Sequence, residues 1–292
     1  MTGRVVCVGD LMTDVLARLP GPLAPGSDTP SRIGLFGGGA AANVAVGLAT
    51  AGLDAVFVGR IGHDALGRHA VAELAAHRVT PAISHDPLRA SGTCIVLVAP
   101  DGERTMIPDA GANAGLGEVD PATLPEAADC LYLSGYALLD SGARPFALAA
   151  LAHARDRGWL IAVDAASAAP LAAIGADVFG RWVGRGVVLF ANEDETRVLL
   201  GGEPDDPARA LAAQYGEAVV KLGAAGAVWS DGVDECVVGA RPTTVIDTTG
   251  AGDALSAGFL SARLAGGDAR ACLERGAEFA ARVVSQVGAR PR

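Results

Sequence analysis

The stretch Asp247-Thr248-Thr249-Gly250-Ala251-Gly252-Asp253 decides how the rest of this sequence is interpreted. Thr244–Asp247 is expected to end a strand and Leu255–Leu264 to form a helix, so the two glycines lie in a turn between them. Small residues let the backbone adopt turns that bulkier residues avoid. The N–H groups at a helix start have no partner within the helix and carry the positive end of its dipole. The segment therefore predicts an anion hole over Gly250–Gly252, with Asp253 beside it to accept a proton.

Taken alone, these residues also fit an ordinary helix start with an acidic residue in its first turn. The phosphate-binding pattern Gly-x-x-x-x-Gly-Lys-Ser/Thr occurs nowhere in the chain, which excludes a P-loop enzyme. The rest of the sequence must therefore decide between an anion hole and a simple cap.

The composition indicates a well-packed globular protein without a basic surface. Half of the 292 residues are apolar and 19% are charged, which supports a large core and excludes wholesale disorder. The formal charge of −10 argues against a nucleic-acid partner, because phosphate backbones are bound by basic faces. The five cysteines are scattered and form no Cys-x-x-Cys pair, so we expect reduced thiols rather than a disulfide frame or a zinc site.

The N-terminal segment gives no indication of export. Val5–Val8 follows Arg4 directly, and this apolar run is too short for a signal peptide. No apolar run in the sequence approaches the length of a membrane span. We therefore expect a cytoplasmic protein with no membrane partner.

Short β-branched runs alternate with alanine-rich segments along the chain. This alternation is typical of βαβ units around a mainly parallel sheet. Strands are expected at Val5–Val8, Val56–Val58, Cys130–Leu133, Leu160–Val163, Val187–Phe190 and Ala218–Lys221. Helices are expected at Ala41–Ala51, Ala65–His77, Phe146–Arg155, Ala254–Leu264 and Ala271–Val284.

Two segments interrupt the alternation. Residues 11–36 are rich in proline, with only short strand-like pieces, and residues 93–108 contain two strand patterns around the turn Pro100–Glu103. Antiparallel strands inserted in a parallel α/β chain predict a small β lid made of these two segments. The lid is expected over the carboxyl ends of the main strands, where open α/β sheets bind ligands. Residues 288–292 are interpreted as a short tail.

A second cluster of small and polar residues lies near the N-terminus. Gly38 and Gly39 precede an expected helix, and Asn43 lies in its first turn. Free backbone groups and one amide can donate to and accept from several hydroxyl groups of a polyol, and Asp14 adds an acceptor for two neighbouring hydroxyls. Asp14 considered alone also fits a solvated loop acid.

The same glycines allow a competing interpretation. Gly37-x-Gly39-x-x-Ala42 fits the dinucleotide fingerprint of a dehydrogenase, and Arg60 would suit a 2′-phosphate. The strand ahead of this fingerprint would be only Ile33–Phe36, within the proline-rich segment. The dehydrogenase interpretation also does not explain the Gly-Ala-Gly-Asp segment that ends at Asp253.

The two clusters together resemble the signatures of the ribokinase-like, phosphofructokinase-B type carbohydrate kinases. Residues 247–255 resemble the C-terminal signature, and Gly38–Ala45 resembles the N-terminal signature Gly-Gly-x-x-Ala-Asn-x-Ala. Val58–Gly67 and Lys221–Gly226 also follow the family pattern. The four matches keep the order of the family and span nearly the whole chain.

The resemblance implies a single kinase domain over residues 1–292, built as a three-layer α/β/α sandwich with a mainly parallel central sheet and a β lid. It implies transfer of the γ-phosphate of ATP, with Mg²⁺, to a hydroxyl group, expected to be a primary alcohol of a small sugar or sugar acid. Asp253 is then the catalytic base, and the amides of Gly250, Ala251 and Gly252 form the anion hole. The matching substrate-binding positions are Asp14, Gly38, Gly39 and Asn43.

On the nucleotide side, the resemblance points to an Asn-x-x-Glu motif that organises Mg²⁺ and phosphate through water. Asn192 and Glu195 match it, although their spacing equally fits a capping box. Lys221 is expected to reach a phosphate as a point charge, with Gly223 and Gly226 in the turn that follows.

Two further expectations follow from the resemblance alone. Asp247 and the carbonyl group of Thr249 match positions that bind a monovalent cation such as K⁺ in some family members. In some relatives the lid edge also pairs with a second subunit, so a homodimer through the lid is a further possibility.

The acceptor is the least determined part of this interpretation. Ribokinases carry polar residues where this chain has Met12, Ala40 and Ala41, which weakens the case for ribose. The run Gly9-Asp10-x-Met12-x-Asp14 is nearer to fructokinases and ketodeoxygluconate kinases. A nucleoside kinase stays open because apolar and small residues also admit a base. A sensor that binds sugar or nucleotide without turnover is the alternative from another class.

Overall fold

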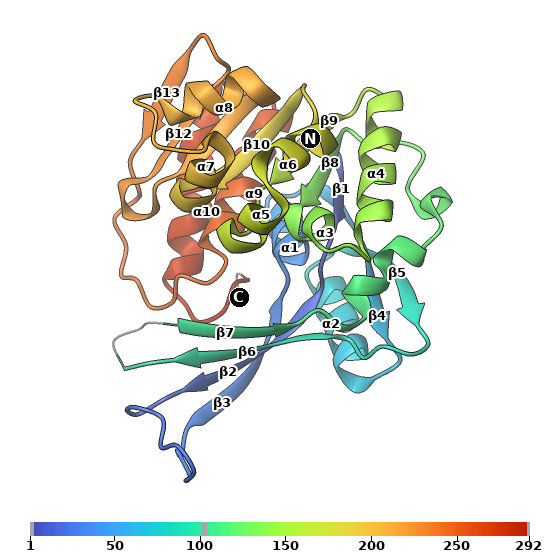
Figure 1. Ribbon diagram of the computed structural model, residues 1–292, viewed down its shortest axis with the longest axis vertical. Coiled ribbons are helices and arrows are strands. Elements are labelled where there is room, and N and C mark those ends of the chain that lie inside the picture. The colour runs from blue at the N-terminus through green and yellow to red at the C-terminus, as the bar shows by residue number, and fades with distance from the viewer. Residues whose placement is uncertain (1–2, 101–103, 291–292) are drawn as a thin grey trace.

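The structure is a computed structural model that describes residues 3–100 and 104–290. Its main sheet has nine strands in the order β13-β12-β11-β10-β9-β8-β1-β4-β5 (Figure 1). The strands from β11 to β5 pair in parallel, and β12 and β13 add an antiparallel edge. Their bounds are β1 Arg4–Val8, β4 Asp54–Gly62, β5 Thr80–Asp86, β8 Cys130–Ser134, β9 Leu160–Asp164, β10 Val187–Asn192, β11 Gly216–Lys221, β12 Ala227–Ser230 and β13 Glu235–Val238.

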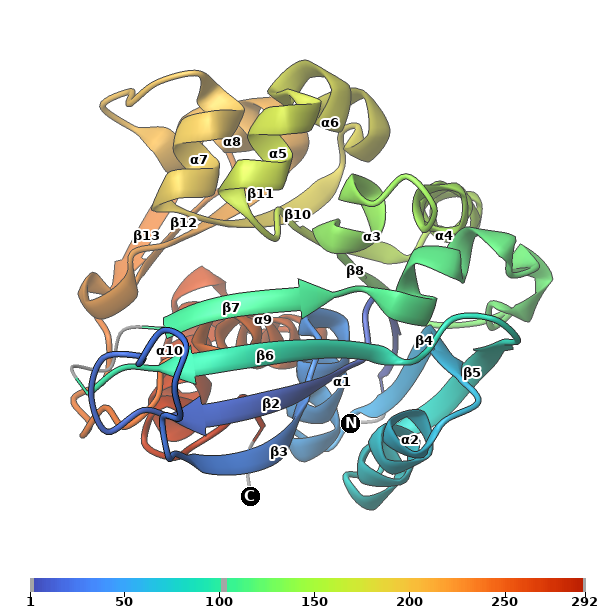
Figure 2. The ribbon, with the colours of Figure 1, turned by 60° about the horizontal axis from the view of Figure 1, so that its bottom comes forward.

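Helices cover both faces of this sheet (Figure 2). One apolar cluster joins the sheet to α1 Ala40–Thr50, α2 Ala65–Ala76, α9 Ala251–Leu264 and α10 Ala269–Val284. A second joins the opposite face to α3 Gly135–Leu139, α4 Arg144–Asp156, α5 Ala168–Ile174, α6 Ala176–Val183, α7 Glu193–Leu200 and α8 Pro207–Tyr215. The short 3₁₀ segments are η1 Gly111–Glu118, η2 Pro121–Thr123 and η3 Gly223–Ala225.

The central strand β1 explains why its sequence is a continuous apolar run. Val5, Val6, Cys7 and Val8 all have no exposed surface, because both sides of the strand face helices. Strands buried on both faces lose the alternation of apolar and polar residues. The predicted three-layer α/β/α sandwich with a mainly parallel sheet is therefore confirmed.

A separate four-stranded sheet, in the order β3-β2-β6-β7, forms the lid. Its strands are β2 Met12–Arg18, β3 Arg32–Gly38, β6 Gly92–Val98 and β7 Arg104–Asp109. Figures 1 and 2 show the lid extending across one end of the main sheet. The strands agree with the predicted lid segments, residues 11–36 and 93–108, to within about two residues. Residues 101–103 of the expected turn Pro100–Glu103 lie outside the described residues.

The expected strand end at Thr244–Asp247 is wrong. This segment is irregular, and the N–H groups of Ile246 and Asp247 both donate to the carbonyl group of Val284, at 2.7 and 3.2 Å. Val245 and Ile246 are exposed. β-branched residues favour a strand only where a neighbouring strand and a buried face are available, and here the chain runs past the end of α10 instead.

The expectation of a loose tail at residues 288–292 is also wrong for the part that the structure describes. Residues 288–290 are buried, and Arg290 is only 5% exposed. Residues 291 and 292 lie outside the described residues. Arg290 contacts Asn43 of α1 and the carbonyl group of Gly38, so the described end of the chain lies beside the junction between the lid and α1.

Three further features concern the cysteine side chains, the metal-binding types of side chain and the lengths of the helices. All five cysteines lie in the described part and are free thiols, and all except Cys236 are buried. Across residues 3–100 and 104–290, no three His, Cys, Asp or Glu side chains gather as a metal site would require. No helix in these same ranges is long and apolar enough to cross a lipid bilayer.

Candidate active site

The Gly-Ala-Gly segment forms the start of α9, as the sequence predicted. Gly250 is the N-cap and has a φ of 74°, a left-handed conformation that glycine adopts without strain. A Cβ atom at Gly250 would lie 2.6 Å from the Cβ of Ala289, so this turn needs glycine for space as well. The first helical hydrogen bond runs from Ala254 N to Gly250 O at 2.9 Å. The N–H groups of Gly252 and Asp253 therefore precede the helical ladder and remain able to receive an anion.

Asp253 and Asn43 bring the two sequence clusters together. Asn43 Nδ2 donates to Asp253 Oδ2 at 2.8 Å, across 210 positions of sequence. Burial raises the pKa of Asp253 to about 7, while the hydrogen bond from Asn43 opposes the rise and the nearby Asp164 adds to it. A carboxyl group with a pKa close to neutrality is well suited to accept a proton from a hydroxyl group.

The predicted polyol residues also meet at one place. Gly39 is the N-cap of α1 with a φ of 92°, and a Cβ there would collide with the backbone of Asp10. A Cβ at Gly38 would collide with the carboxylate of Asp14, so this glycine makes room for the acid. Asp14 lies on the lid strand β2 and is 7% exposed. Burial raises its pKa to about 6, against the lowering influence of Arg290.

Lys221 lies between the predicted nucleotide side and the anion hole. It ends β11, and its Nζ contacts Asp164 Oδ2 at 2.8 Å. The same Nζ would be 3.3 Å from a Cβ atom at Gly252, so the ammonium group packs directly against the Gly-Ala-Gly backbone. Burial lowers the pKa of Lys221, but the carboxylates of Asp164, Glu195 and Asp253 together outweigh it and the pKa is raised. Gly223 and Gly226 form the turn after this strand, both with positive φ.

Asn192 and Glu195 form a complete capping box at the start of α7. Asn192 N donates to Glu195 Oε2 at 2.8 Å, Asn192 Nδ2 donates to Oε1 at 2.8 Å, and Glu195 N donates to Asn192 Oδ1 at 2.9 Å. Glu195 is 2% exposed, and burial raises its pKa. The capping role is thus present, and a role toward Mg²⁺ stays a prediction that would pass through water.

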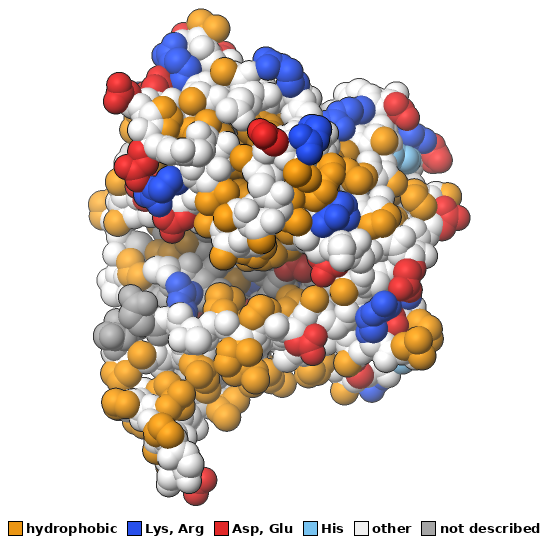
Figure 3. Space-filling view, viewed as in Figure 1, with side chains coloured by type: hydrophobic (Ala, Val, Ile, Leu, Met, Phe, Trp, Pro, Cys, Tyr) orange, Lys and Arg blue, Asp and Glu red, His pale blue; other side chains and the backbone are white. Residues whose placement is uncertain are grey.

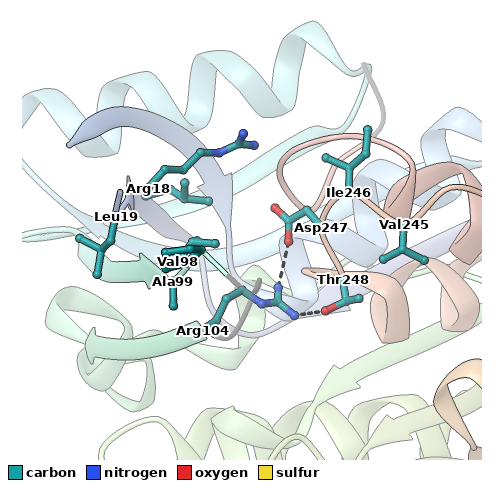
Figure 4. Close-up of a pocket in the computed structure, with 11 residues that line it drawn as sticks. Arg18, Leu19, Val98, Ala99, Arg104, Val245, Ile246, Asp247 and Thr248 are labelled. Carbon is teal, nitrogen blue, oxygen red and sulfur yellow. Dashed lines mark hydrogen bonds and ion pairs between the residues drawn. The ribbon is translucent and has the colours of Figure 1, made fainter. Parts of the chain in front are cut away.

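The expected cation position is occupied by a side chain from the lid. Arg104 of β7 places Nη1 2.9 Å from Asp247 Oδ1, and its guanidinium also contacts the hydroxyl group of Thr248 (Figure 4). The same guanidinium contacts the hydroxyl group of Thr249. Asp247 Oδ2 accepts from Gly288 N at 3.0 Å. Both oxygens of this carboxylate therefore have partners within the chain.

Arg104 and Asp247 border a pocket of about 530 Å³ between the lid and the segment before the anion hole. Figure 3 shows the surface hollowed between the lid and the main body. Apolar side chains from the lid strands β2 and β6, from the residues after these strands and from the segment 245–248 are the most numerous in its lining, but polar groups contribute more of the exposed pocket surface. The lining residues are Leu16, Arg18, Leu19, Val98, Ala99, Pro100, Arg104, Val245, Ile246, Asp247 and Thr248 (Figure 4).

Sequence reasoning missed two polar residues around the polyol end. Asp10 Oδ2 accepts from Ala40 N at 3.0 Å, whereas its buried Oδ1 has no hydrogen-bond partner in the described part of the chain. Its position directly after β1, at the carboxyl end of a buried strand, is the signal that could have identified it. Asn113 fixes Leu11, in the connection between β1 and the lid strand β2. Its Oδ1 accepts from Leu11 N at 3.0 Å, and its Nδ2 donates to Leu11 O at 3.1 Å.

The structure also rejects the dehydrogenase interpretation. The strand ahead of the glycines, β3, belongs to the lid sheet and not to the main parallel sheet. Arg60 is 7% exposed and ion-paired with Asp86 at 3.1 Å and Glu118 at 2.9 Å. Its charge is already neutralised, so it is not free to receive a 2′-phosphate.

A two-ended cleft of this kind, under a β lid on an α/β/α sandwich, defines a small-molecule kinase. Residues 2–292 match the model of the pfkB family carbohydrate kinases, and the chain belongs to this family. It is 29% identical to the ATP-dependent ribose-1-phosphate kinase of Halopiger xanaduensis over 98% of this chain and 94% of the relative. It is 30% identical to a fructokinase of Klebsiella pneumoniae over 91% and 86%. The expectation of an ATP-dependent carbohydrate kinase is confirmed.

Solved structures show the same fold. Adenosine kinase from Sinorhizobium meliloti superposes with a TM-score of 0.88 at 25% identity, covering 99% of this chain and 96% of that one. A fructokinase double mutant from Vibrio cholerae, with fructose, ADP and a potassium ion bound, superposes with a TM-score of 0.79 at 25% identity and covers 98% and 94%. A putative ribokinase II from E. coli, similar in fold with a TM-score of 0.84, was solved with ATP and Mg²⁺.

Proposed function

We propose that this kinase phosphorylates a hydroxyl group of a neutral polyol, with Asp253 as the base. The observation that carries this proposal is the charge at the acceptor end. Asp10, Asp14 and Asp253 converge there, and the charge of Asp10 contributes to the raised pKa of both Asp14 and Asp253. The nearby cation, Arg290, is ion-paired with Glu73 at 3.1 Å.

An anionic acceptor would add a further negative charge to this cluster. Two like charges 4 Å apart repel by about 1 kcal/mol in water and by about 4 kcal/mol at the effective dielectric of a protein surface. Sugar acids and sugar phosphates therefore face a penalty that neutral sugars avoid. We therefore narrow the expected acceptor from a sugar or sugar acid to a neutral sugar.

The chain supplies the groups that such a transfer needs. Asp253 would accept the proton of the attacking hydroxyl, and the amides of Gly252 and Asp253 would receive the charge that develops on the transferring group. Lys221, packed against Gly252, would add a positive charge on the nucleotide side. The lid would exclude water, which otherwise competes as acceptor.

Mg²⁺ bound with ATP would neutralise phosphate charge. The donor set of this chain fits an ion that keeps its waters and is held by the nucleotide, because Glu195 is engaged in its capping box and Asp164 pairs with Lys221. We therefore assign Asp164, Asn192 and Glu195 to the outer hydration of this ion. Gly223 and Gly226 would line the nucleotide side of the same cleft.

The proposal is tested by incubating purified protein with ATP and Mg²⁺ and one of four acceptors, then identifying products by mass spectrometry. D-fructose and adenosine are the neutral acceptors, and 2-dehydro-3-deoxygluconate and ribose-1-phosphate are the anionic ones. We expect kcat/KM for a neutral acceptor to exceed that for both anions. A preference of tenfold or more for an anion, about 1.4 kcal/mol, would overturn the charge argument. Binding without product would instead support the silent sensor.

A nucleoside is the second candidate acceptor, favoured by one observation. The chain superposes on adenosine kinase from Sinorhizobium meliloti with a TM-score of 0.88 at 25% identity, and adenosine is a nucleoside. The adenosine arm of the same assay decides between the two neutral acceptors, and a higher kcat/KM for adenosine than for D-fructose would establish the nucleoside.

We further propose that Asp247 and the Thr249 carbonyl group bind a monovalent cation only when Arg104 withdraws. The Arg104 guanidinium now pairs with Asp247 Oδ1, so a K⁺ ion would compete with a charge already present. Wild-type activity should change less than twofold between KCl and choline chloride, whereas Arg104→Met should become dependent on K⁺. Strong K⁺ activation of the wild type would contradict the competition.

The outer face of the lid supports a homodimer, which we propose as the assembled state. Leu35, Val15, Ile95 and Ile107 pair in register across all four lid strands and form one apolar row. Leu35 is 53% exposed and Ile107 is 52% exposed. Light scattering at micromolar concentration should give a dimer for the wild type and a monomer for Ile95→Lys. A monomeric wild type would refute this assembly.

We also propose that residues 1–292 act as one domain in the cytoplasm, where ATP is available. The lid is joined to the main body by the hydrogen bond of Leu11 N with Asn113 and by the ion pair of Arg104 with Asp247. A single cooperative transition on thermal unfolding is the expected result for one domain. Two separate transitions would show that the lid and the main body are independent units.

A further inference from the structure

The last described residue, Arg290, lies inside the candidate site. It is 5% exposed, and its guanidinium points in three directions. Nε donates to Asn43 Oδ1 at 3.0 Å, Nη2 donates to Gly38 O at 2.8 Å, and Nη1 pairs with Glu73 Oε1 at 3.1 Å. One side chain thereby connects α1, α2 and the junction between the lid and α1.

The surrounding backbone is shaped to hold this arginine. A Cβ atom at Gly37 would collide with the Arg290 guanidinium. Gly288 N donates to Asp247 Oδ2 at 3.0 Å, and Gln286 Nε2 donates to Arg290 O at 2.7 Å. Ala289 packs against Gly250, so the same segment that carries Arg290 also supports the turn of the anion hole.

Arg290 determines how the carboxamide of Asn43 is oriented. A guanidinium only donates hydrogen bonds, so the group that faces Arg290 must be the amide oxygen. The NH₂ group of Asn43 is then directed to Asp253, which it contacts at 2.8 Å. The chain of contacts thus runs from Arg290 through Asn43 to the proposed base.

We propose that Arg290 is a positioning residue for phosphoryl transfer, which holds Asn43 against Asp253 and makes the C-terminal segment part of the active site. This inference rests on the proposed function, because it takes Asp253 as the base. Arg290 acts through Asn43, so its loss should affect the rate of transfer more than the binding of nucleotide. Its positive charge also stabilises the ionised carboxyl group of Asp253, because opposite charges favour each other's charged form.

Two variants separate the positioning from the charge. Arg290→Met removes both the positive charge and the hydrogen bond to Asn43. Arg290→Lys keeps the positive charge beside Glu73, but its single ammonium group cannot reach Asn43, Gly38 and Glu73 together. We expect kcat with D-fructose, or with adenosine if that acceptor is used, to fall about 10- to 100-fold in Arg290→Met, as for a lost charge-assisted hydrogen bond. The KM for Mg-ATP should stay within about twofold, since Arg290 does not face the nucleotide. Arg270→Met, an exposed arginine of α10, is the matched control.

The pH profile and a double-mutant cycle make the test specific. The acid limb of kcat/KM should move to higher pH in Arg290→Met and stay near the wild type in Arg290→Lys. At pH 9, where Asp253 is largely ionised whatever the charge of residue 290, Arg290→Met in an Asn43→Ala background should lower kcat less than threefold, because its route to the base through Asn43 is already lost. If Arg290→Met does not fold, the Lys variant carries the cycle, since it retains the ion pair with Glu73.

A wild-type kcat in Arg290→Met, or an equal fall with and without Asn43, would overturn the inference. These results are distinguishable from a failure of the proposed function. An active Asp253→Asn variant would remove the base itself and with it the proposed function. An inactive Asp253→Asn variant beside a fully active Arg290→Met would overturn only the role of Arg290.

Discussion

Replacing Asn43 by Ala should shift the pH dependence of the reaction. Asn43 Nδ2 donates to Asp253 at 2.8 Å and lowers a carboxyl pKa that burial raises to about 7. A hydrogen bond to a charged group contributes about 1.5–3 kcal/mol, which corresponds to about one to two pKa units. Water entering the vacated space would recover part of this, so we expect a rise of about one unit.

The sign follows from which form is active. The base must be ionised, so the wild-type rate rises with pH through about 7. In Asn43→Ala the acid limb should lie about one unit higher, and the ionised fraction at neutral pH falls from about a half to about a tenth. The loss of rate from this cause should therefore be about fivefold at pH 7 and should shrink as the pH approaches 9.

The assay is the pH profile of kcat/KM for the accepted sugar or nucleoside, at saturating Mg-ATP, since this ratio reports the enzyme before the acceptor binds. Thr50→Ala, at the far end of α1, is the matched control. An acid limb that stays in place, or that moves to lower pH, would refute the link between Asn43 and the ionisation of Asp253. A uniform loss at every pH would assign Asn43 to acceptor binding alone.

Three other variants follow from the same geometry. Asp253→Asn should raise the free energy of unfolding at pH 8 by about 1–3 kcal/mol. The pKa of Asp253 is raised in the folded state, so the wild type loses stability as the pH rises from about 4 to about 7 and this carboxyl group ionises. Chemical denaturation at pH 4 and pH 8 should therefore show the gain in the variant only at pH 8. A gain at both would contradict this. Asp14→Ala should raise the acceptor KM about tenfold with a smaller change in kcat, as for a lost hydrogen bond to substrate, and an unchanged KM would show that the acceptor lies elsewhere. Lys221→Met removes a positive charge from the nucleotide side and leaves the buried carboxylate of Asp164 without its partner. We therefore expect kcat/KM for Mg-ATP to fall at least about tenfold, and a wild-type value would exclude contact between Lys221 and phosphate.

Patterns fixed by the local backbone were predictable from the sequence. The apolar run Val5–Val8 predicted the buried β1, and the Gly-Ala-Gly turn predicted the start of α9. That the segments of Asn43 and Asp253 belong to one site followed because two signatures of one family were recognised, whereas the hydrogen bond between the two side chains was not predicted. Helix starts and buried strands depend on a few neighbouring residues, which is why short patterns describe them.

Contacts between residues that are far apart in the sequence were not predictable in this way. Only two residues follow Arg290 in the sequence, and nothing in its neighbours distinguishes it from a solvated tail arginine. Its burial depends on space left by Gly37 and on the charge of Glu73 in a distant helix. Thr244–Asp247 shows the opposite error: its β-branched residues suggest a strand, but the fold provides no neighbouring strand there.

The proposed mechanism has Asp253 take the proton of the acceptor hydroxyl, beside the amides of Gly252 and Asp253. Its most direct test is a rapid-quench single turnover with γ-³²P-labelled ATP, Mg²⁺ and the accepted polyol, comparing the wild type with Asp253→Asn. We expect label transfer to slow at least about a hundredfold in the variant, while the dissociation constant for Mg-ATP changes little. Transfer at the wild-type rate by Asp253→Asn would contradict it.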